Sequence, residues 1–421
     1  MKRFLCLTLL LTAATALRAE PQYSALFGQS CYLCHAGATG RGMRSLYGSQ
    51  FFGPTYLPFK PVSFELLEKV KPKLSESVSI GANLRTIWMS ENTQHDTAEA
   101  GLSAPLSTNT GTVSQMEGYL YFALQPTEEV LLYYSQGISS SRFEVYGQAN
   151  VLPWHGFVKA GHFQENFGWV FADHTSFVRT GLFSDYNGSV TAVPDAPRYG
   201  VGAEIGFRPK FFDITASFTN ASSTIPGARD TQKRWFARAS AQHGIESLGL
   251  QFSIGGSWFL APRKYADPEF LFAVEQRRYE GWGGFGAIGW QGLQDRFGCH
   301  GGFGFLTTAV MFEYDRKAWS PGVDELAQPL FQSSAYSTTQ ASVMVQPGVW
   351  ISGAYDWLDN GWKGTGLSSW YNDQEAERTT LGLQVFPLPW IEIAPRYRLY
   401  TLAGGALRNK QMMELQAHFF F

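Results

Sequence analysis

Residues 413–421 read Met-Glu-Leu-Gln-Ala-His-Phe-Phe-Phe, and every second residue of this stretch, beginning with its first, is apolar. Because side chains of a β-strand point alternately to its two faces, the spacing predicts a strand with one apolar face. The other face carries Glu414, Gln416 and His418. In a soluble sandwich, the apolar face would pack on a shared core. In a membrane-spanning barrel, it would contact lipid while the polar face lines the interior.

The same alternation recurs along the chain, in 201–208, 213–218, 250–254 and 391–399. Short turns and long connections alternate along the chain, as periplasmic turns and extracellular loops do in an outer-membrane barrel. The short turns are 126–128, 152–154, 208–210, 243–246, 346–348 and 386–389, and the long connections are 90–113, 164–197, 220–232, 261–281, 315–334 and 359–378. Pairing them predicts an all-β fold, a transmembrane antiparallel β-barrel of about 16 strands over residues 77–421.

The composition agrees with a barrel. The chain has 44% hydrophobic, 15% aromatic and 16% charged residues with 44 glycines, and no stretch of about 18 apolar residues that would form a transmembrane helix. A last strand ending on Phe421 looks like the assembly signal of outer-membrane barrels. The formal net charge of −2 argues against nucleic acid as a partner.

The first 19 residues are typical of a secretory signal peptide. Lys2 and Arg3 precede an apolar run over residues 4–16, and small residues follow up to Ala19. Cleavage there would remove Cys6. Residues 20–76 then form a separate segment ahead of the barrel.

This segment contains Cys31-Tyr32-Leu33-Cys34-His35, the only Cys-x-x-Cys-His in the chain. Two thiols at this spacing can bond the vinyl groups of one haem c, and the adjacent histidine can bind its iron. A disulfide between Cys31 and Cys34 is the alternative in an oxidising compartment, but it does not require His35. Cys299 is expected to be a structural thiol.

The rest of the segment is rich in glycine and proline, so it predicts little regular structure. Ser63 is suited to cap a short helix from Phe64 to about Lys71. A segment this short is small for an independent cytochrome domain, because it can bury little apolar surface. We therefore expect the haem to pack inside or against the periplasmic opening of the barrel.

The second axial ligand has two candidates. Met43 is the nearest methionine, and a hydrophobic contact with the porphyrin is its alternative role. His418 is predicted to point into the lumen near the same end, where an ordinary polar lining residue is the alternative. His162 and His174 could be reached only by a haem deep inside the barrel.

Hydrolytic and phosphate-binding motifs are absent from the sequence. Acidic residues of the long connections could attract a cation such as Fe²⁺, although ordinary solvated loop charge is the simpler explanation for any one of them. They include Asp173, Asp195, Asp324, Glu325, Asp373, Glu375 and Glu377.

With these features, the chain resembles the fused monohaem cytochrome–porins of iron-oxidising bacteria. The likeness rests on the secretion signal, the single haem motif and a barrel of this size. It extends to the flanking sequences Phe27-Gly28-Gln29-Ser30 and Leu46-Tyr47-Gly48-Ser49-Gln50-Phe51. The resemblance implies one haem c, with Cys31 and Cys34 as thioether residues and His35 as the proximal iron ligand.

The expected function is electron transfer at the bacterial outer membrane. The resemblance implies that extracellular Fe(II) is oxidised, an iron(II) oxidase-like activity, and that electrons pass to a periplasmic c-type cytochrome. Two alternatives stay open: outward transfer to extracellular acceptors, and a diffusion porin in which the haem is a gate, plug or stabiliser. In the porin, inward-facing charges would set the solute selectivity: Glu204, Arg208, Asp213, Arg396 and Arg398.

Overall fold

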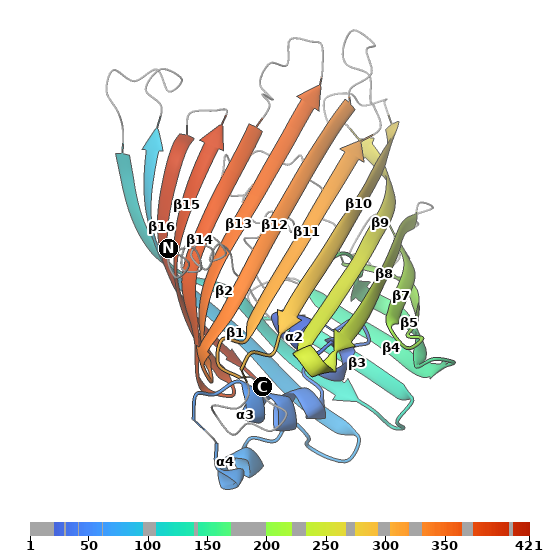
Figure 1. Ribbon diagram of the computed structural model, residues 1–421. Coiled ribbons are helices and arrows are strands. Elements are labelled where there is room, and N and C mark those ends of the chain that lie inside the picture. The colour runs from blue at the N-terminus through green and yellow to red at the C-terminus, as the bar shows by residue number, and fades with distance from the viewer. Residues whose placement is uncertain are drawn as a thin grey trace.

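The described residues of the chain form one closed barrel of 16 antiparallel strands, as the sequence predicts (Figure 1). Each strand pairs with its neighbours in the sequence, and β1 pairs with β16 to close the ring. The computed structural model describes residues 21–28, 31–40, 42–60, 62–95, 107–138, 142–169, 199–220, 233–266, 274–293, 304–319, 331–363, 374–403 and 407–421.

The strands differ in length around the ring. Those from β3 to β7 are short, and most of the others are long. Their bounds are β1 Val78–His95, β2 Ser107–Leu124, β3 Val130–Gly137, β4 Phe143–Leu152, β5 Gly156–Gln164, β6 Tyr199–Phe207, β7 Phe212–Asn220, β8 Lys233–Ile245, β9 Leu250–Ala266, β10 Val274–Trp290, β11 Thr308–Trp319, β12 Phe331–Gln346, β13 Val349–Lys363, β14 Gln374–Leu388, β15 Ile391–Ala403 and β16 Leu407–Phe420.

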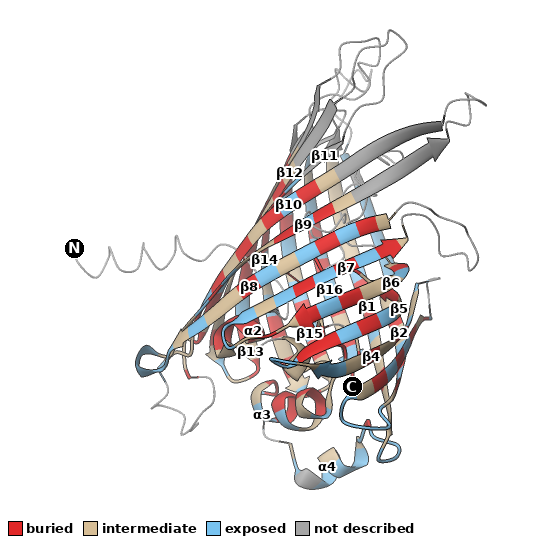
Figure 2. Cartoon of the chain, turned by 90° about the vertical axis from the view of Figure 1, so that its right-hand side faces the viewer, coloured by how far each residue is buried: buried red, intermediate tan, exposed pale blue. Residues whose placement is uncertain are grey.

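The two faces of the wall have opposite chemistry, as the alternation predicts. On β7, Ile214 and Phe218 are 43% and 39% exposed on the outer face, whereas Thr215 and Ser217 are buried on the inner face. Exposed and buried residues alternate along the strands in the same way around the wall (Figure 2). A continuous apolar outer face is the surface that lipid tails solvate, so the wall has the character of a transmembrane barrel.

Several strands run further than the sequence predicts. The expected connection 90–113 contributes residues to both β1 and β2, and Glu375 and Glu377 belong to β14 rather than to a loop. These extensions are polar, but the backbone ladder pairs them regardless of side-chain type. The β10–β11 connection, residues 291–307, departs from the expected order because it is long at the end where the other turns are short.

The N-terminal segment forms short helices at this short-turn end. They are α2 Pro21–Phe27, η1 Cys31–Leu33, η2 Tyr47–Phe52, α3 Gly53–Tyr56 and α4 Phe64–Lys69, with η4 Glu246–Leu248 in a turn of the barrel. The predicted cap is confirmed: the Ser63 hydroxyl accepts a hydrogen bond from the backbone N–H of Leu66. No described helix is long and apolar enough to cross a membrane.

The first helix of the segment lies inside the barrel. Helix α2 packs against the inner faces of β9, β10 and β11, while α3 and α4 lie at and beyond the opening (Figures 1 and 2). Leu26, Phe52 and Leu57 of the segment share an apolar cluster with wall residues that include Trp350 and Phe386. N-terminal residues of the chain therefore occupy part of the opening.

The outer face allows a direct test of the lipid contact. Ile254 lies midway along the apolar belt of β9 and is 70% exposed, so Ile254→Lys should lower the free energy of unfolding in lipid vesicles by about 2–4 kcal/mol. Leu248, 57% exposed in the η4 turn, is the matched control, and its lysine variant should change stability by less than about 0.5 kcal/mol. Equal costs at the two positions in denaturant titrations would contradict a membrane-facing wall.

Candidate haem-binding site

The motif of residues 31–35 adopts a single tight turn. The backbone N–H groups of Cys34 and His35 both donate to the carbonyl of Cys31, each at 3.2 Å. In a helical turn, residues three apart are neighbours on one face, so the two cysteines lie next to each other. Both are half-buried free thiols, without the disulfide that was the alternative.

The ring of His35 is held by the loop that follows it. Its Nδ1 atom lies 3.2 Å from the carbonyl oxygen of Gly42, and a carbonyl can only accept, so Nδ1 carries the proton. The lone pair then belongs to Nε2, as required of a histidine that binds iron. An isolated antiparallel β-bridge joins His35 to Arg44. The Ala36 N–H also donates to the Met43 carbonyl at 2.9 Å, and these contacts together close the loop.

Two glycines allow the loop to lie directly on the cysteines. A Cβ atom at Gly40 would stand 2.0 Å from the Cβ of Cys31, and Gly40 also has a left-handed φ of 74°. A Cβ atom at Gly48 would stand 2.2 Å from the carbonyl oxygen of Cys34. The glycines that predict irregular structure therefore also allow the segments around Gly40 and Gly48 to pack closely against the motif.

Ser45 ties the motif to η2. Its hydroxyl donates to the Leu33 carbonyl at 2.6 Å and accepts from the Gly48 N–H at 3.1 Å, while its own N–H donates to the Cys34 carbonyl at 2.9 Å. These bonds satisfy carbonyls that the single turn leaves without helical partners. The Cys31–His35 motif is thus held by Gly40, by Gly42 and by residues 43–48.

The thiols lie in a weakly solvating environment. Burial raises the pKa of Cys31, opposed by the charge of Arg238, and burial raises the pKa of Cys34 to about 11, opposed by Arg44. Neutral sulfur is favoured here, and a thioether is always neutral. With two thiols side by side and the histidine lone pair on Nε2, the described residues fit a covalently bound haem c.

The barrel wall holds the loop from several directions. The Ala38 N–H donates to the side chain of Gln148 on β4 at 3.1 Å, and the Met43 N–H donates to the hydroxyl of Tyr133 on β3 at 3.1 Å. On the other side, the Arg44 guanidinium lies 4.0 Å from the ring centre of Phe420 on β16. Residues of β3, β4 and β16 therefore position the loop jointly.

Of the two candidate distal ligands, Met43 packs against the wall and His418 belongs to it. Met43 is buried in a cluster with Tyr121, Tyr133, Phe163 and other residues of β2 to β5. His418 points inward as predicted, with Nδ1 2.9 Å from the Glu392 carboxylate and Nε2 3.0 Å from the Asn83 amide oxygen. Iron binding by His418 would break the second bond. Whether either residue is the second axial ligand stays a prediction.

Several other predicted residues lie outside the described part of the chain. These are Cys6, Asp173, His174, Asp195, Cys299, Asp324, Glu325 and Asp373, and the side chain of Glu375 is also not described. Glu377 is exposed on β14. Among the described residues, no group of three or more His, Cys, Asp or Glu side chains could hold a metal ion.

The inward-facing charges expected to set solute selectivity are engaged in pairs. Glu204 is paired with Lys159, Nζ to Oε1 at 2.6 Å, and Arg208 with Asp213 at 3.5 Å. Arg396 and Arg398 both pair with Glu414 on β16. Arg396 also lies 3.9 Å from Glu392, so each of the five predicted charges has at least one partner of opposite sign.

One feature of the lumen was not predicted from the sequence. Immediately after β5, residues 165–169 turn inward and are buried. The Trp169 N–H donates to the Glu313 carboxylate on β11 at 3.1 Å, and the Gly168 N–H donates to the hydroxyl of Ser257 on β9 at 2.8 Å. The stretch therefore crosses the interior from β5 to β9 and β11. Its sequence carries no period-two pattern that would have indicated this path.

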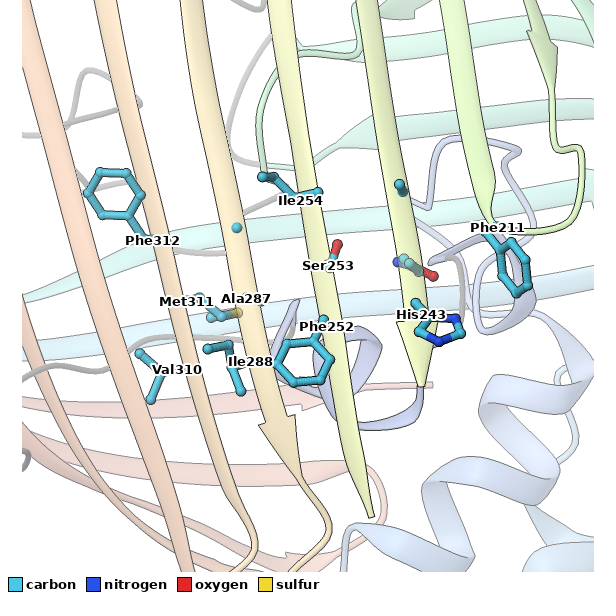
Figure 3. A pocket seen from close by; sticks show the side chains of 13 residues that line it. Phe211, His243, Phe252, Ser253, Ile254, Ala287, Ile288, Val310, Met311 and Phe312 are labelled. Atoms are coloured by element: carbon cyan, nitrogen blue, oxygen red, sulfur yellow. The ribbon is translucent and has the colours of Figure 1, made fainter. Parts of the chain in front are cut away.

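A pocket of about 600 Å³ lies elsewhere, in the wall formed by β8 to β11 (Figure 3). Its labelled rings and branched side chains, such as Phe252, Ile254 and Phe312, belong to the apolar outer face. His243 is the one ionisable residue of its lining. This lipid-facing hollow is separate from the Cys31–His35 motif, and its lining does not combine thiols with a histidine as the motif does.

Comparisons with known proteins bear on the barrel. No protein-family model and no curated protein matches the chain by sequence. Among solved structures, the outer membrane channel DcaP of Acinetobacter baumannii is 12% identical with a TM-score of 0.53, covering 84% of this chain and 100% of that one. OprB of Pseudomonas putida is 10% identical with a TM-score of 0.51 (85% and 96% covered), and in-vitro folded OmpT of Vibrio cholerae is 11% identical with a TM-score of 0.50 (84% and 100%).

These similarities show the fold of the barrel, which is that of outer-membrane porins. The barrel half of the expected cytochrome–porin architecture is therefore confirmed. Its cytochrome half, with the haem on Cys31, Cys34 and His35, stays a prediction.

The close packing at Gly48 can be tested by adding one methyl group at this position. Gly48→Ala should displace the Cys34 carbonyl and loosen the loop, so trypsin should cleave after Arg44 several-fold faster in the folded barrel. Gly284→Ala is the matched control, because a Cβ atom at Gly284 meets no atom within 4 Å. Unchanged cleavage of the Gly48 variant would show that the loop does not rest on the motif.

Proposed function

We propose that this chain is a bacterial outer-membrane electron-transfer protein with one haem c bound to Cys31 and Cys34 and with His35 as the proximal ligand. The observation that carries the proposal is the location of the motif: it lies within the end of a transmembrane barrel, fixed by the wall. We take this end as periplasmic because it has the short turns of the barrel.

The arrangement suits the physical problem. Lipid blocks the passage of both ions and electrons, so an external donor needs a path through the membrane and a redox group at its inner end. The barrel would give a donor access to its interior from the outer side, and the fixed motif would hold the redox group at the inner end. When bound, a haem would supply one-electron exchange between its ferric and ferrous states.

The chain's own residues have clear tasks in this scheme. Cys31 and Cys34 would retain the haem covalently, and the Gly42 carbonyl would orient the His35 ring. We propose Fe(II) as the preferred donor, each ion giving up one electron to become Fe(III), and a periplasmic c-type cytochrome as the acceptor of that electron. Fe(II) as the donor rests on the resemblance stated from the sequence.

Haem attachment and reduction provide the test. The purified protein should show covalent haem in a one-to-one ratio by its pyridine haemochrome spectrum, and Cys34→Ser should weaken or abolish retention in denaturant. Fe(II) should reduce the bound haem rapidly in the visible spectrum. Absence of covalent haem from protein made with an active haem-attachment system would refute the proposal. Haem that Fe(II) leaves oxidised would refute Fe(II) as the donor.

The direction of transfer has its own measurement. A reduction potential well below that of the Fe(III)/Fe(II) couple under the same conditions would favour outward transfer to extracellular acceptors. A potential close to or above that couple is expected if Fe(II) is the donor.

A diffusion porin is the second candidate, and the similarity of the barrel to solved porins favours it. In that case the N-terminal segment would plug or gate the lumen. The full-length protein should show little or no conductance in planar bilayers if electron transfer is its role, because α2 and residues 165–169 both occupy the interior. A stable conductance that passes small solutes would support the porin instead.

A further inference from the structure

Arg208 connects the haem motif to the barrel wall. It directly follows β6, and its side chain is 8% exposed. The guanidinium carbon lies 3.9 Å from the ring centre of Tyr32, and Nη2 donates to the carbonyl of Ala38 at 2.6 Å. Tyr32 lies between the two cysteines in the sequence, and Ala38 lies just beyond His35. One side chain therefore contacts the chain before and after the histidine.

The same guanidinium is anchored to three wall elements. It extends from the end of β6, its Nη1 donates to the His155 carbonyl in the β4–β5 turn at 3.0 Å, and its Nε lies 3.5 Å from the Asp213 carboxylate on β7. A planar guanidinium can stack on a ring and donate in several directions at once, which a lysine ammonium cannot do with the same geometry. This position uses both properties of arginine.

We propose that Arg208 is the positioning residue of the haem motif: it clamps residues 31–38 to the wall, and its charge raises the reduction potential of the bound haem. The inference rests on the proposed function above. The ferric haem carries one more positive charge than the ferrous haem, so a nearby cation disfavours the ferric form. In a buried site, this effect is screened less than in water. Asp213 acts on the potential in the opposite direction.

The charge part of the proposal is tested by spectroelectrochemical titration of the haem. Arg208→Gln should lower the reduction potential and Asp213→Asn should raise it, while Arg208→Lys should stay closer to the original value because it keeps the charge. Arg234→Gln is the matched control. Arg234 is a buried arginine paired with Glu165, but it lies at the long-loop end of β8, so its variant should leave the potential unchanged. Shifts of the same sign for the Arg208→Gln and Asp213→Asn variants would overturn the electrostatic role.

The clamp is tested separately, without haem. In a Cys31→Ser, Cys34→Ser background, the amides of residues 31–44 should exchange roughly tenfold faster with deuterium after Arg208→Gln, because a charged hydrogen bond and a cation–π contact are lost. Arg208→Lys should also accelerate exchange, and Arg234→Gln should not. Unchanged exchange in the Arg208 variants would overturn the clamp. Failure of the original chain to take up haem would instead refute the proposed function, because this exchange experiment does not depend on haem.

Discussion

The pairing of β1 with β16 is the interaction on which the rest of the structure depends. Within lipid, each backbone N–H and C=O must find a partner in the protein, and a sheet achieves this only if it has no edge. The ladder from Asn83 with Phe420 to His95 with Leu407 closes the ring. Closure fixes the two faces of every strand, so apolar side chains contact lipid and the polar ones must find partners inside. The network of Glu392, His418 and Asn83 spans three adjacent strands across this closure.

Much of this fold could be predicted because it depends on a local pattern. Alternation along residues 201–208 or 413–421 identifies the outer face without any knowledge of neighbouring strands. Strand ends are different. Residues of β1 and β2 beyond Ser90 are largely polar on both faces, and they belong to the sheet only because their partners continue alongside them. The same holds for β14, where Glu375 pairs with Ala403 of β15.

The candidate site likewise has a part that the local sequence predicts and a part that depends on distant residues. The Cys31–His35 motif is contiguous, so its spacing alone predicts its chemistry. The contacts that hold it come from distant residues such as Gln148, Arg208 and Phe420, and a single sequence contains no sign of these pairings. Gly40 is intermediate: glycine predicts an unusual backbone, but the close approach to Cys31 becomes visible only in three dimensions. The inward direction of His418 follows from alternation, whereas its two bonds do not.

The N-terminal segment is joined to the barrel by a very short connection, residues 70–77 between α4 and β1. A domain held this closely cannot diffuse away from the opening that it occupies. Its binding is intramolecular, and even a short flexible tether gives an effective concentration on the order of millimolar. Even contacts too weak to hold a separate protein would then keep the segment resident. A separate protein with the same affinity for the opening would have to exceed that concentration, which gives the attached segment a lasting advantage over such a competitor.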